Sequence, residues 1–261
     1  MPDPVLRHDE GAIARLTLNT PGNYNALSTQ MIESLRGHLD RIGTDDSVRV
    51  VIIDAAGKAF CAGHDLRQMQ QARHDQDGGA RALRTLFADC AALMQRLAAL
   101  PQPVIAQVQG IATAAGCQLV ASCDLAVAAD TARFGVNGVN IGLFCSTPMV
   151  ALTRAVPPKA AFEMLTTGEF IGADRACALG LVNRAVPPED LAASTLEMAE
   201  AIAGKLPSAV RMGKAAFYAQ LGLPLDAAYD SASATMCANV MAPDTAEGMA
   251  AFLDKRPPAW H

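Results

Sequence analysis

Aromatic and charged residues are both scarce in this chain of 261 residues. Phe, Trp and Tyr together make up 5% of it, with a single Trp, while Asp, Glu, Lys and Arg make up 18%. With so few aromatic rings, a base-stacking surface for single-stranded nucleic acid is not expected. The 21 basic and 26 acidic residues give a formal net charge of -5, so no strongly basic surface is expected either. We therefore expect neither nucleic acid nor a membrane as a partner.

Long apolar runs and metal-binding motifs are missing as well. A run of about 18 apolar residues, the length that spans a bilayer, does not occur. The seven cysteines are scattered through apolar segments without a C-x-x-C pair, and H-E-x-x-H is absent. We expect no metal site and interpret the cysteines as buried and reduced. The start, Met1–Pro4, lacks a secretory signal pattern, so we expect a cytoplasmic location, or the mitochondrial matrix if the source is eukaryotic.

Apolar residues are what the chain has in abundance, at 51% of the sequence. That fraction, together with the low charge, is typical of a folded chain and not of a disordered one. A chain of this length forms one large domain or two small ones and buries about three quarters of its unfolded surface.

The first half of the sequence predicts strands that alternate with helices. A helix is expected from Ser28, which can cap it, because five apolar residues recur at helical spacing: Met31, Ile32, Leu35, Leu39 and Ile42. A second helix is expected over 80–100. The segment 54–66 is predicted to be a loop, and the polar segment 67–79 a mobile one. Strands are expected at 11–18, 48–53, 104–108 and 124–128.

The second half is predicted to be mainly helical, with one short strand near 182–186. The expected helices are 159–167, 173–179, 189–204, 207–220, 225–240 and 244–254. Several apolar residues there exceed what a single core can cover, which favours a closed symmetric assembly. They are Met198, Ile202, Met212, Phe217, Tyr218, Met249 and Phe252.

A helix of small residues is expected at 114–122, directly after a glycine-containing turn. Small side chains allow close approach of neighbouring backbone. The first N–H groups of a helix have no partner within the helix. A buried helix start can therefore hold an anion or a polarised carbonyl oxygen.

Several segments in register resemble the crotonase superfamily, also called the enoyl-CoA hydratase/isomerase family. They are 18–28 (LNTPGNYNALS), 57–66 (GKAFCAGHDL), 103–128, 134–154 and 247–257. Within that family, the run at 134–148 is similar to the subgroup called enoyl-CoA hydratase domain-containing protein 3. The resemblance covers nearly the whole chain.

The resemblance implies an α/β fold with a β/β/α spiral core over 1–195. A helical trimerisation region would follow over 196–261. It implies acyl-CoA thioesters as ligands, a place in fatty acid or acyl-CoA metabolism, and a homotrimer or dimer of trimers. Coenzyme A would be part of the substrate, so no separate cofactor is expected.

The family's shared chemistry implies an oxyanion hole of two backbone N–H groups, which stabilises the enolate oxygen of a thioester. By alignment the donors here are the N–H groups of His64 and Ala115. Family hydratases carry two catalytic glutamates, and the matching residues are Gln118 and Gly138. A glutamine orients water but cannot take its proton, so we expect weak hydratase activity. Isomerisation, thioester hydrolysis, decarboxylation and non-catalytic CoA binding remain alternatives.

The resemblance also implies a set of substrate-binding residues around these donors. Cys145 lies where some relatives place another acid, and it is interpreted either as a buried cysteine or as a nucleophile that would need a base such as His64. Lys255 would contact coenzyme A, either in its own subunit or in a neighbouring one. The implied substrate-binding residues are Tyr24, Asn25, Ala26, Leu27, Ala62, Asp65, Leu66, Ile111, Ala112, Gly116, Phe144 and Lys255.

Overall fold

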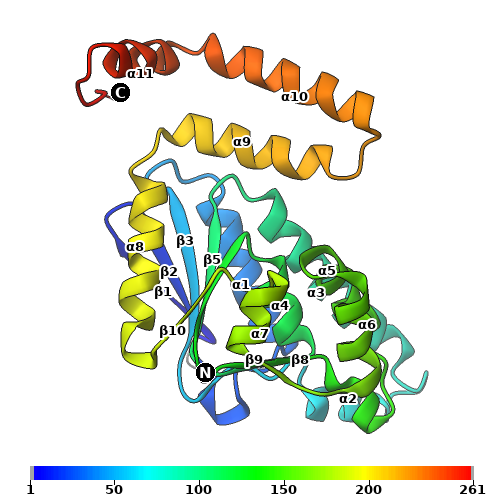
Figure 1. Ribbon diagram of the computed structural model, residues 1–261. Helices are drawn as coiled ribbons and strands as arrows, with labels where there is room; N and C mark the ends of the chain where they lie inside the picture. Colours follow the sequence, from blue (N-terminus) through cyan, green and yellow to red (C-terminus); the bar gives the residue numbers. More distant parts are fainter. Residues whose placement is uncertain (1–2, 260–261) are drawn as a thin grey trace.

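The computed structural model describes residues 3–259 and shows two β-sheets wrapped by helices (Figure 1). The larger sheet has six strands in the order β1-β2-β3-β5-β7-β10. These are β1 (Val5–Glu10), β2 (Ile13–Leu18), β3 (Val50–Ala55), β5 (Val104–Val108), β7 (Leu125–Ala129) and β10 (Arg184–Val186). The smaller sheet has the order β4-β6-β8-β9. Its strands are β4 (Ala59–Cys61), β6 (Ile111–Thr113), β8 (Arg133–Gly135) and β9 (Ile171–Gly172).

The two sheets are built by repeated turns of one spiral. Strands β3 and β4, then β5 and β6, then β7 and β8 each place one strand in the large sheet and the next in the small sheet. Neighbouring turns pair in parallel in both sheets, which requires a crossover after each turn. Only β1 with β2 and β8 with β9 pair antiparallel within the described range. This arrangement confirms the α/β fold with a β/β/α spiral core that the sequence indicated.

The described chain contains eleven α-helices, most of them close to the predicted ranges. The first six are α1 (Thr29–Ile42), α2 (Leu66–Ala72), α3 (Ala80–Ala99), α4 (Ala115–Ser122), α5 (Ser146–Ala155) and α6 (Pro158–Thr167). The other five are α7 (Ala173–Leu179), α8 (Leu191–Ala203), α9 (Pro207–Gln220), α10 (Leu225–Val240) and α11 (Pro243–Leu253). Short 3-10 turns cover η1 (Pro21–Asn23), η2 (Asn137–Ile141) and η3 (Pro188–Asp190).

Helix α1 shows why its sequence folds as predicted. The hydroxyl of Ser28 accepts a hydrogen bond from the N–H of Met31 at 3.2 Å and so caps the helix. The five apolar residues that share one face are all buried against the strands and α3. Each such side chain contributes about 1.5–3 kcal/mol when fully buried.

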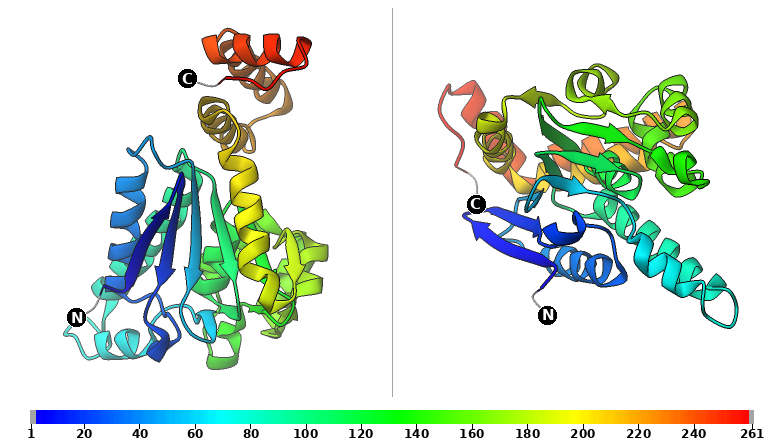
Figure 2. Two further views of the ribbon diagram at one scale, coloured as in Figure 1. Left: turned by 90° about the vertical axis from the view of Figure 1, so that its left-hand side faces the viewer. Right: turned by 90° about the horizontal axis from the view of Figure 1, so that it is seen from below.

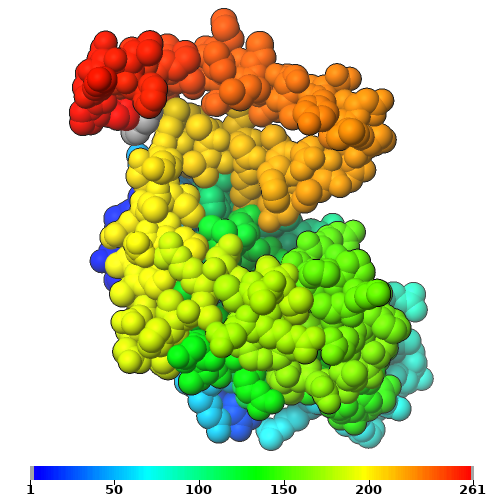
Figure 3. All heavy atoms as spheres, in the orientation of Figure 1, coloured from blue at the N-terminus to red at the C-terminus, as the bar shows by residue number. Residues whose placement is uncertain are grey.

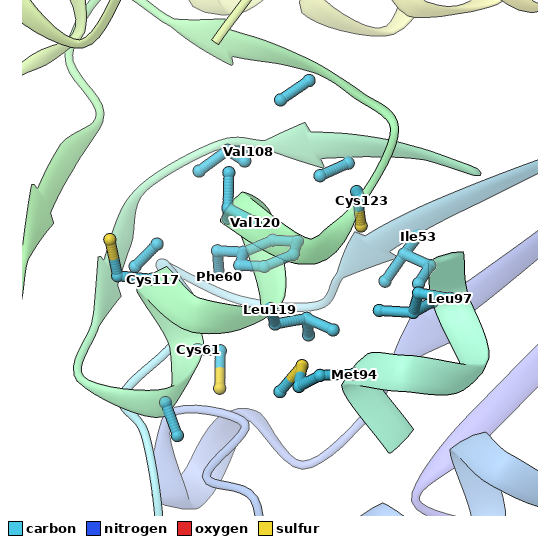
Figure 4. Close-up of a cluster of buried hydrophobic side chains, with 14 of the residues drawn as sticks. Ile53, Phe60, Cys61, Met94, Leu97, Val108, Cys117, Leu119, Val120 and Cys123 are labelled. Carbon is cyan, nitrogen blue, oxygen red and sulfur yellow. The ribbon is translucent and has the colours of Figure 1, made fainter. Parts of the chain in front are cut away.

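The central strands of the large sheet are buried on both faces. In β3, Val51 and Ile53 belong to the main core together with α1, α3 and α4, while Val50 and Ile52 pack against α8 on the opposite face. Figure 4 shows part of the main core, where Phe60 and Leu119 approach from the small sheet and from α4. Burial on both faces explains the continuous β-branched run in this strand.

Several short elements lie where the sequence predicted loops. The segment 54–66 contains β4, and the segment 67–79, predicted to be mobile, contains most of α2. The carboxylate of Asp65 caps α2 by accepting hydrogen bonds from the N–H groups of Arg67 and Gln68. Polar residues on an exposed helix leave no apolar stripe to detect, which is why the sequence did not predict α2.

The C-terminal helices α9, α10 and α11 form a lobe at one end of the molecule (Figures 2 and 3). Its apolar side chains are widely exposed, including Leu225 at 75% and Phe252 at 83%. Two residues expected to be surplus, Met198 and Ile202, instead pack on the large sheet through α8.

Candidate active site

The His64 segment is a tight turn pinned to the chain before α1. Gly63 has φ +89, and its C=O accepts a hydrogen bond from the N–H of Leu27 at 2.7 Å. Leu27 and His64 also form a parallel β-bridge. The turn is therefore fixed by backbone pairing on one side and by the capped helix α2 on the other.

The Ala115 segment is a second tight turn, at the start of α4. Ala114 adopts φ 49 and ψ -120, outside the regions that side chains favour, and its N–H donates to the C=O of Gly135 at 2.9 Å. Helix α4 begins at Ala115, so the N–H of Ala115 lies at the positive end of the helix dipole. Strain of this kind costs about 1–3 kcal/mol and persists where the surroundings enforce it.

These two turns meet closely. A Cβ at Gly63 would lie 3.2 Å from the backbone N of Ala115 and 2.9 Å from the Cβ of Ala114. Within residues 3–259, the backbone N–H groups of His64 and Ala115 have no hydrogen-bond acceptor. Two unpaired donors on adjacent fixed turns are the arrangement that can hold one oxygen with developing negative charge. The structure thus brings together the two residues that the sequence predicted as donors.

Gln118 lies one helical turn after Ala115. Its side chain is only 4% exposed, and its Oε1 is buried without a hydrogen-bond partner in the described part of the chain. An unpaired buried amide oxygen costs about 1–3 kcal/mol. Gln118 is therefore neutral and buried, and its Oε1 can accept a hydrogen bond from a bound ligand or water.

Gly138 lies in a turn that leaves no room for a side chain. A Cβ there would lie 2.4 Å from the C=O oxygen of Leu143 and 2.8 Å from the Sγ of Cys145. The turn is closed by the N–H of Leu143, which donates to the C=O of Gly138 at 2.9 Å. The thiol of Cys145 thus occupies the volume that a side chain at 138 would enter. Burial raises the pKa of that thiol, so it stays protonated at neutral pH.

The imidazole of His64 is held from two sides. Its Nδ1 lies 3.3 Å from the C=O oxygen of Leu27, and its ring meets Phe87 of α3 edge-on, with centroids 5.4 Å apart. Burial lowers the pKa of the imidazole below its usual value of 6.5, which favours the neutral form. Its Nε2 is buried and has no partner among the described residues.

The loop before Leu27 contains both framework and surface residues. Asn25 is fully buried with φ 55, and its side chain bonds to the N–H of Thr20 and the C=O groups of Ala56 and Ala59. Asn25 therefore holds the loop in place and does not reach solvent. Ala26 is buried beside it, while Tyr24 is 47% exposed and lies under the ammonium of Lys58.

The remaining predicted residues divide into supports and surface groups. Gly116 packs α4 onto β4, because a Cβ there would lie 2.1 Å from the C=O oxygen of Cys61. Lys255 lies beyond α11, at the end of the molecule opposite to α2 (Figures 1 and 2). Ala112 is buried and Ala62 half-buried, whereas Leu66, Ile111 and Phe144 are exposed.

A cleft of about 910 Å³ lies between α2 and α3, and the sequence did not predict it. Thr29 and Gln68 line it and bond to each other, with Gln68 Nε2 donating to Thr29 Oγ1 at 2.6 Å. Met69 and Leu86 add apolar surface, and His74 and Arg81 are among the polar lining residues. Neither His64 nor Phe87 is among the residues that line the cleft. The only signal in the sequence was the polar segment 67–79 itself.

Other kinds of site find no support in the described residues. In residues 3–259, no group of three or more His, Cys, Asp or Glu side chains is placed to hold a metal ion. Over the same range, no helix has the length and hydrophobicity needed to cross a bilayer. The seven cysteines are free, and five of them are buried.

Comparison with known proteins supports one family. Residues 8–261 match the model of the enoyl-CoA hydratase/isomerase family. The chain is 47% identical to enoyl-CoA hydratase domain-containing protein 3, mitochondrial, of Xenopus laevis, over 99% of this chain and 86% of that protein. It superposes on a crystal structure of an enoyl-CoA hydratase from Mycobacterium smegmatis with a TM-score of 0.95 and 51% identity, covering 99% of each chain. The crystal structure of human enoyl-CoA hydratase domain-containing protein 3 superposes with a TM-score of 0.94 and 43% identity, covering 98% of this chain and all of that one. The chain therefore belongs to the enoyl-CoA hydratase/isomerase family.

Proposed function

We propose that this protein binds acyl-CoA thioesters and stabilises the enolate form of the thioester through the N–H groups of His64 and Ala115. The observation that carries the proposal is the pair of unpaired donors on two adjacent, fixed turns. Donors held in place before the ligand arrives need no reorganisation when charge develops on the oxygen. The α4 dipole adds a favourable field at Ala115.

The cleft between α2 and α3 suits the acyl group. It adjoins α2, the helix that begins two residues after His64, although His64 itself does not line it. Met69, Leu83 and Leu86 offer apolar contacts, while His74 and Arg81 are polar. We therefore propose that the acyl chain occupies this cleft between α2 and α3.

The reaction we propose is enolate chemistry other than efficient hydration. Hydration needs one group to activate water and another to protonate the carbon, and each contributes roughly 10²–10⁴-fold. Gln118 is neutral, and position 138 has no side chain and no room for one. Isomerisation, hydrolysis or decarboxylation of a thioester, each relying on the oxyanion hole and few side chains, fits these residues better. Binding without turnover is the second candidate, favoured by the same two positions.

The assembly we propose is a homotrimer or dimer of trimers, with the chain from residue 196 onward as the oligomerisation region. Met241 and Leu253 are each 78% exposed in the C-terminal lobe, and Phe252 is 83% exposed. Exposed apolar surface of this extent is usually covered by association. Light scattering at micromolar concentration should return three or six times the mass of the chain; the mass of a monomer would contradict the proposal.

The compartment we propose is a reducing one, either the cytoplasm or the mitochondrial matrix. The free, mostly buried cysteines suit such a compartment, and the related proteins from frog and human carry the word mitochondrial in their names.

Calorimetry tests the binding proposal. Butyryl-CoA should bind saturably, and the thioether S-butyl-CoA, which lacks only the carbonyl oxygen, should bind more weakly by roughly 1–3 kcal/mol, the worth of two hydrogen bonds. Free coenzyme A serves as the reference for contacts outside the thioester. If no acyl-CoA of short, medium or long chain binds at millimolar concentration, the function is wrong. Equal binding of the thioester and the thioether would contradict the assignment of the two donors.

A further inference from the structure

His64 contributes more to the site than its backbone N–H. The side chain is fixed in one tautomer, because Nδ1 faces the C=O oxygen of Leu27 at 3.3 Å and a carbonyl can only accept a hydrogen bond. Nδ1 therefore carries the proton, and Nε2 presents its lone pair. The edge-on contact with Phe87 fixes the ring plane.

The lone pair on Nε2 is buried and receives no hydrogen bond within the described chain. A buried polar atom without a partner costs free energy, and its presence in a folded protein is often explained by a bound ligand or a catalytic role. This atom belongs to the residue whose N–H is one of the two oxygen donors.

No charged group holds the imidazole in its protonated form within residues 3–259. Phe87 of α3 and the carbonyl of Leu27 are its contacts, and neither bears a charge. The carboxylate of Asp65, the next residue, is engaged by the N–H groups of Arg67 and Gln68. Burial lowers the pKa of His64, so the imidazole is an unprotonated base at neutral pH.

The other groups near the two donors are unsuited to accept a proton. Gln118 carries an amide, and position 138 has no side chain. Cys145 is a thiol whose pKa is raised by burial. Among the described residues around this site, His64 alone combines a free lone pair with a fixed orientation.

We propose that His64 is a catalytic residue whose Nε2 removes a proton from the carbon next to the thioester carbonyl. The proposal rests on the proposed binding of acyl-CoA at this site. The C–H bond breaks, its proton forms a bond to Nε2, and its electron pair becomes the carbon–carbon double bond of the enolate. The carbonyl electrons move to the oxygen, which the N–H groups of His64 and Ala115 hold. Return of the proton from the imidazolium to the same carbon restores the thioester.

This step has a readout that does not depend on the final reaction. When butyryl-CoA is incubated with the protein in D₂O, the hydrogens next to the carbonyl should be replaced by deuterium, as seen by mass spectrometry. The variant His64→Phe keeps the backbone N–H and an aromatic ring against Phe87 but has no Nε2. Because a general base contributes roughly 10²–10⁴-fold, the exchange rate should fall by about 10²-fold or more. The matched control His8→Phe makes the same change at an exposed residue of β1 and should exchange like the wild type.

Binding of butyryl-CoA by calorimetry separates this inference from the proposed function. Binding without exchange in the wild type, or unchanged exchange in His64→Phe, overturns the role of His64 and leaves the binding function intact. Absence of binding in the wild type overturns the function itself. If His64→Phe does not fold, His64→Ala gives the same test, with added imidazole expected to restore exchange. Failure of imidazole to restore exchange in a folded, ligand-binding His64→Ala also contradicts the proposal.

Discussion

The ammonium of Lys214 in α9 lies 2.7 Å from Oδ2 of Asp124, and this pair joins the C-terminal lobe to the spiral core. The same ammonium donates to the C=O groups of Leu97 and Gln102, at 2.8 Å and 3.0 Å. Oδ1 of Asp124 accepts a hydrogen bond from the hydroxyl of Tyr218, also in α9. Every donor of Lys214 is thus used, and α9 is attached at a defined position.

Removing this ammonium should destabilise the protein strongly. Lys214→Met keeps the length of the side chain but leaves the half-buried Asp124 carboxylate without its cation and two carbonyls without a donor. Breaking a buried pair from one side typically costs about 3–5 kcal/mol. Chemical denaturation should show a loss of this size, and limited proteolysis should cut first between α8 and α9. Lys205→Met, at an exposed lysine in that connection, is the control and should leave stability unchanged.

Crotonyl-CoA hydration by the wild type should be at least about 10⁴-fold slower than in a hydratase with both carboxylates, if the two lost groups act independently. Gln118→Glu alone should raise turnover above that of the wild type, because it restores one ionisable group at a buried position. Gln95→Glu, at an exposed site on α3, is the matched control. The rate is followed by loss of the enoyl absorbance. A wild-type rate near 10 s⁻¹ would show that a base has been overlooked.

Restoring a side chain at Gly138 should fail for a steric reason. In Gly138→Ala the new Cβ would lie 2.4 Å from the C=O oxygen of Leu143, which is backbone and cannot swing aside. We expect a loss of about 1–3 kcal/mol, as for other overpacked sites. Gly213→Ala in α9 meets no atom within 4 Å and should instead stabilise by up to about 1 kcal/mol. Thermal denaturation should show a lower melting temperature for Gly138→Ala and an unchanged or higher one for Gly213→Ala. A Gly138→Ala variant as stable as the wild type would contradict the steric argument.

Acidification from pH 7 to pH 5 should weaken the fold, partly through His64. Burial lowers the pKa of His38 and His64 in the folded state below the usual 6.5. As the pH falls through about 6.5, these two imidazoles therefore bind protons in the unfolded chain but remain neutral in the folded one. The free energy of unfolding consequently decreases. His64→Phe should show a smaller decrease over this interval. His8→Phe should keep the wild-type slope, and identical slopes in both variants would show that His64 does not cause the acid sensitivity.

Elements marked by apolar residues and bounded by Gly or Pro could be predicted from the sequence. Strand β5 and helices α7, α9 and α10 lie within the predicted ranges to the residue, because apolar spacing and flanking Gly or Pro mark them. Strands β4, β6, β8 and β9 have two or three residues each, too few for an alternating pattern. They exist because the turns of the spiral stack, which is a property of the tertiary structure.

The site was predictable to a similar degree. The resemblance predicts His64 and Ala115 as donors, and the structure brings their turns together. It could not show that Ala114 tolerates φ 49, since that conformation is imposed by the bond to Gly135. Nor could it show that the amide of Asn25 is fully used inside the protein, because burial of an asparagine depends on partners more than thirty residues away.

The parallel stacking of the spiral turns also bears on how the protein folds. Ala59 pairs with Ile111, and Ile111 pairs with Arg133. Gly63 approaches Ala115 beside these aligned strands. Contacts between such distant parts of the chain cost loop-closure entropy before they give any stabilisation, so chains of this topology refold slowly. We therefore expect the turns that carry His64 and Ala115 to form late in folding. Recovery of ligand binding during refolding should lag behind the recovery of helical signal from α1 and α3.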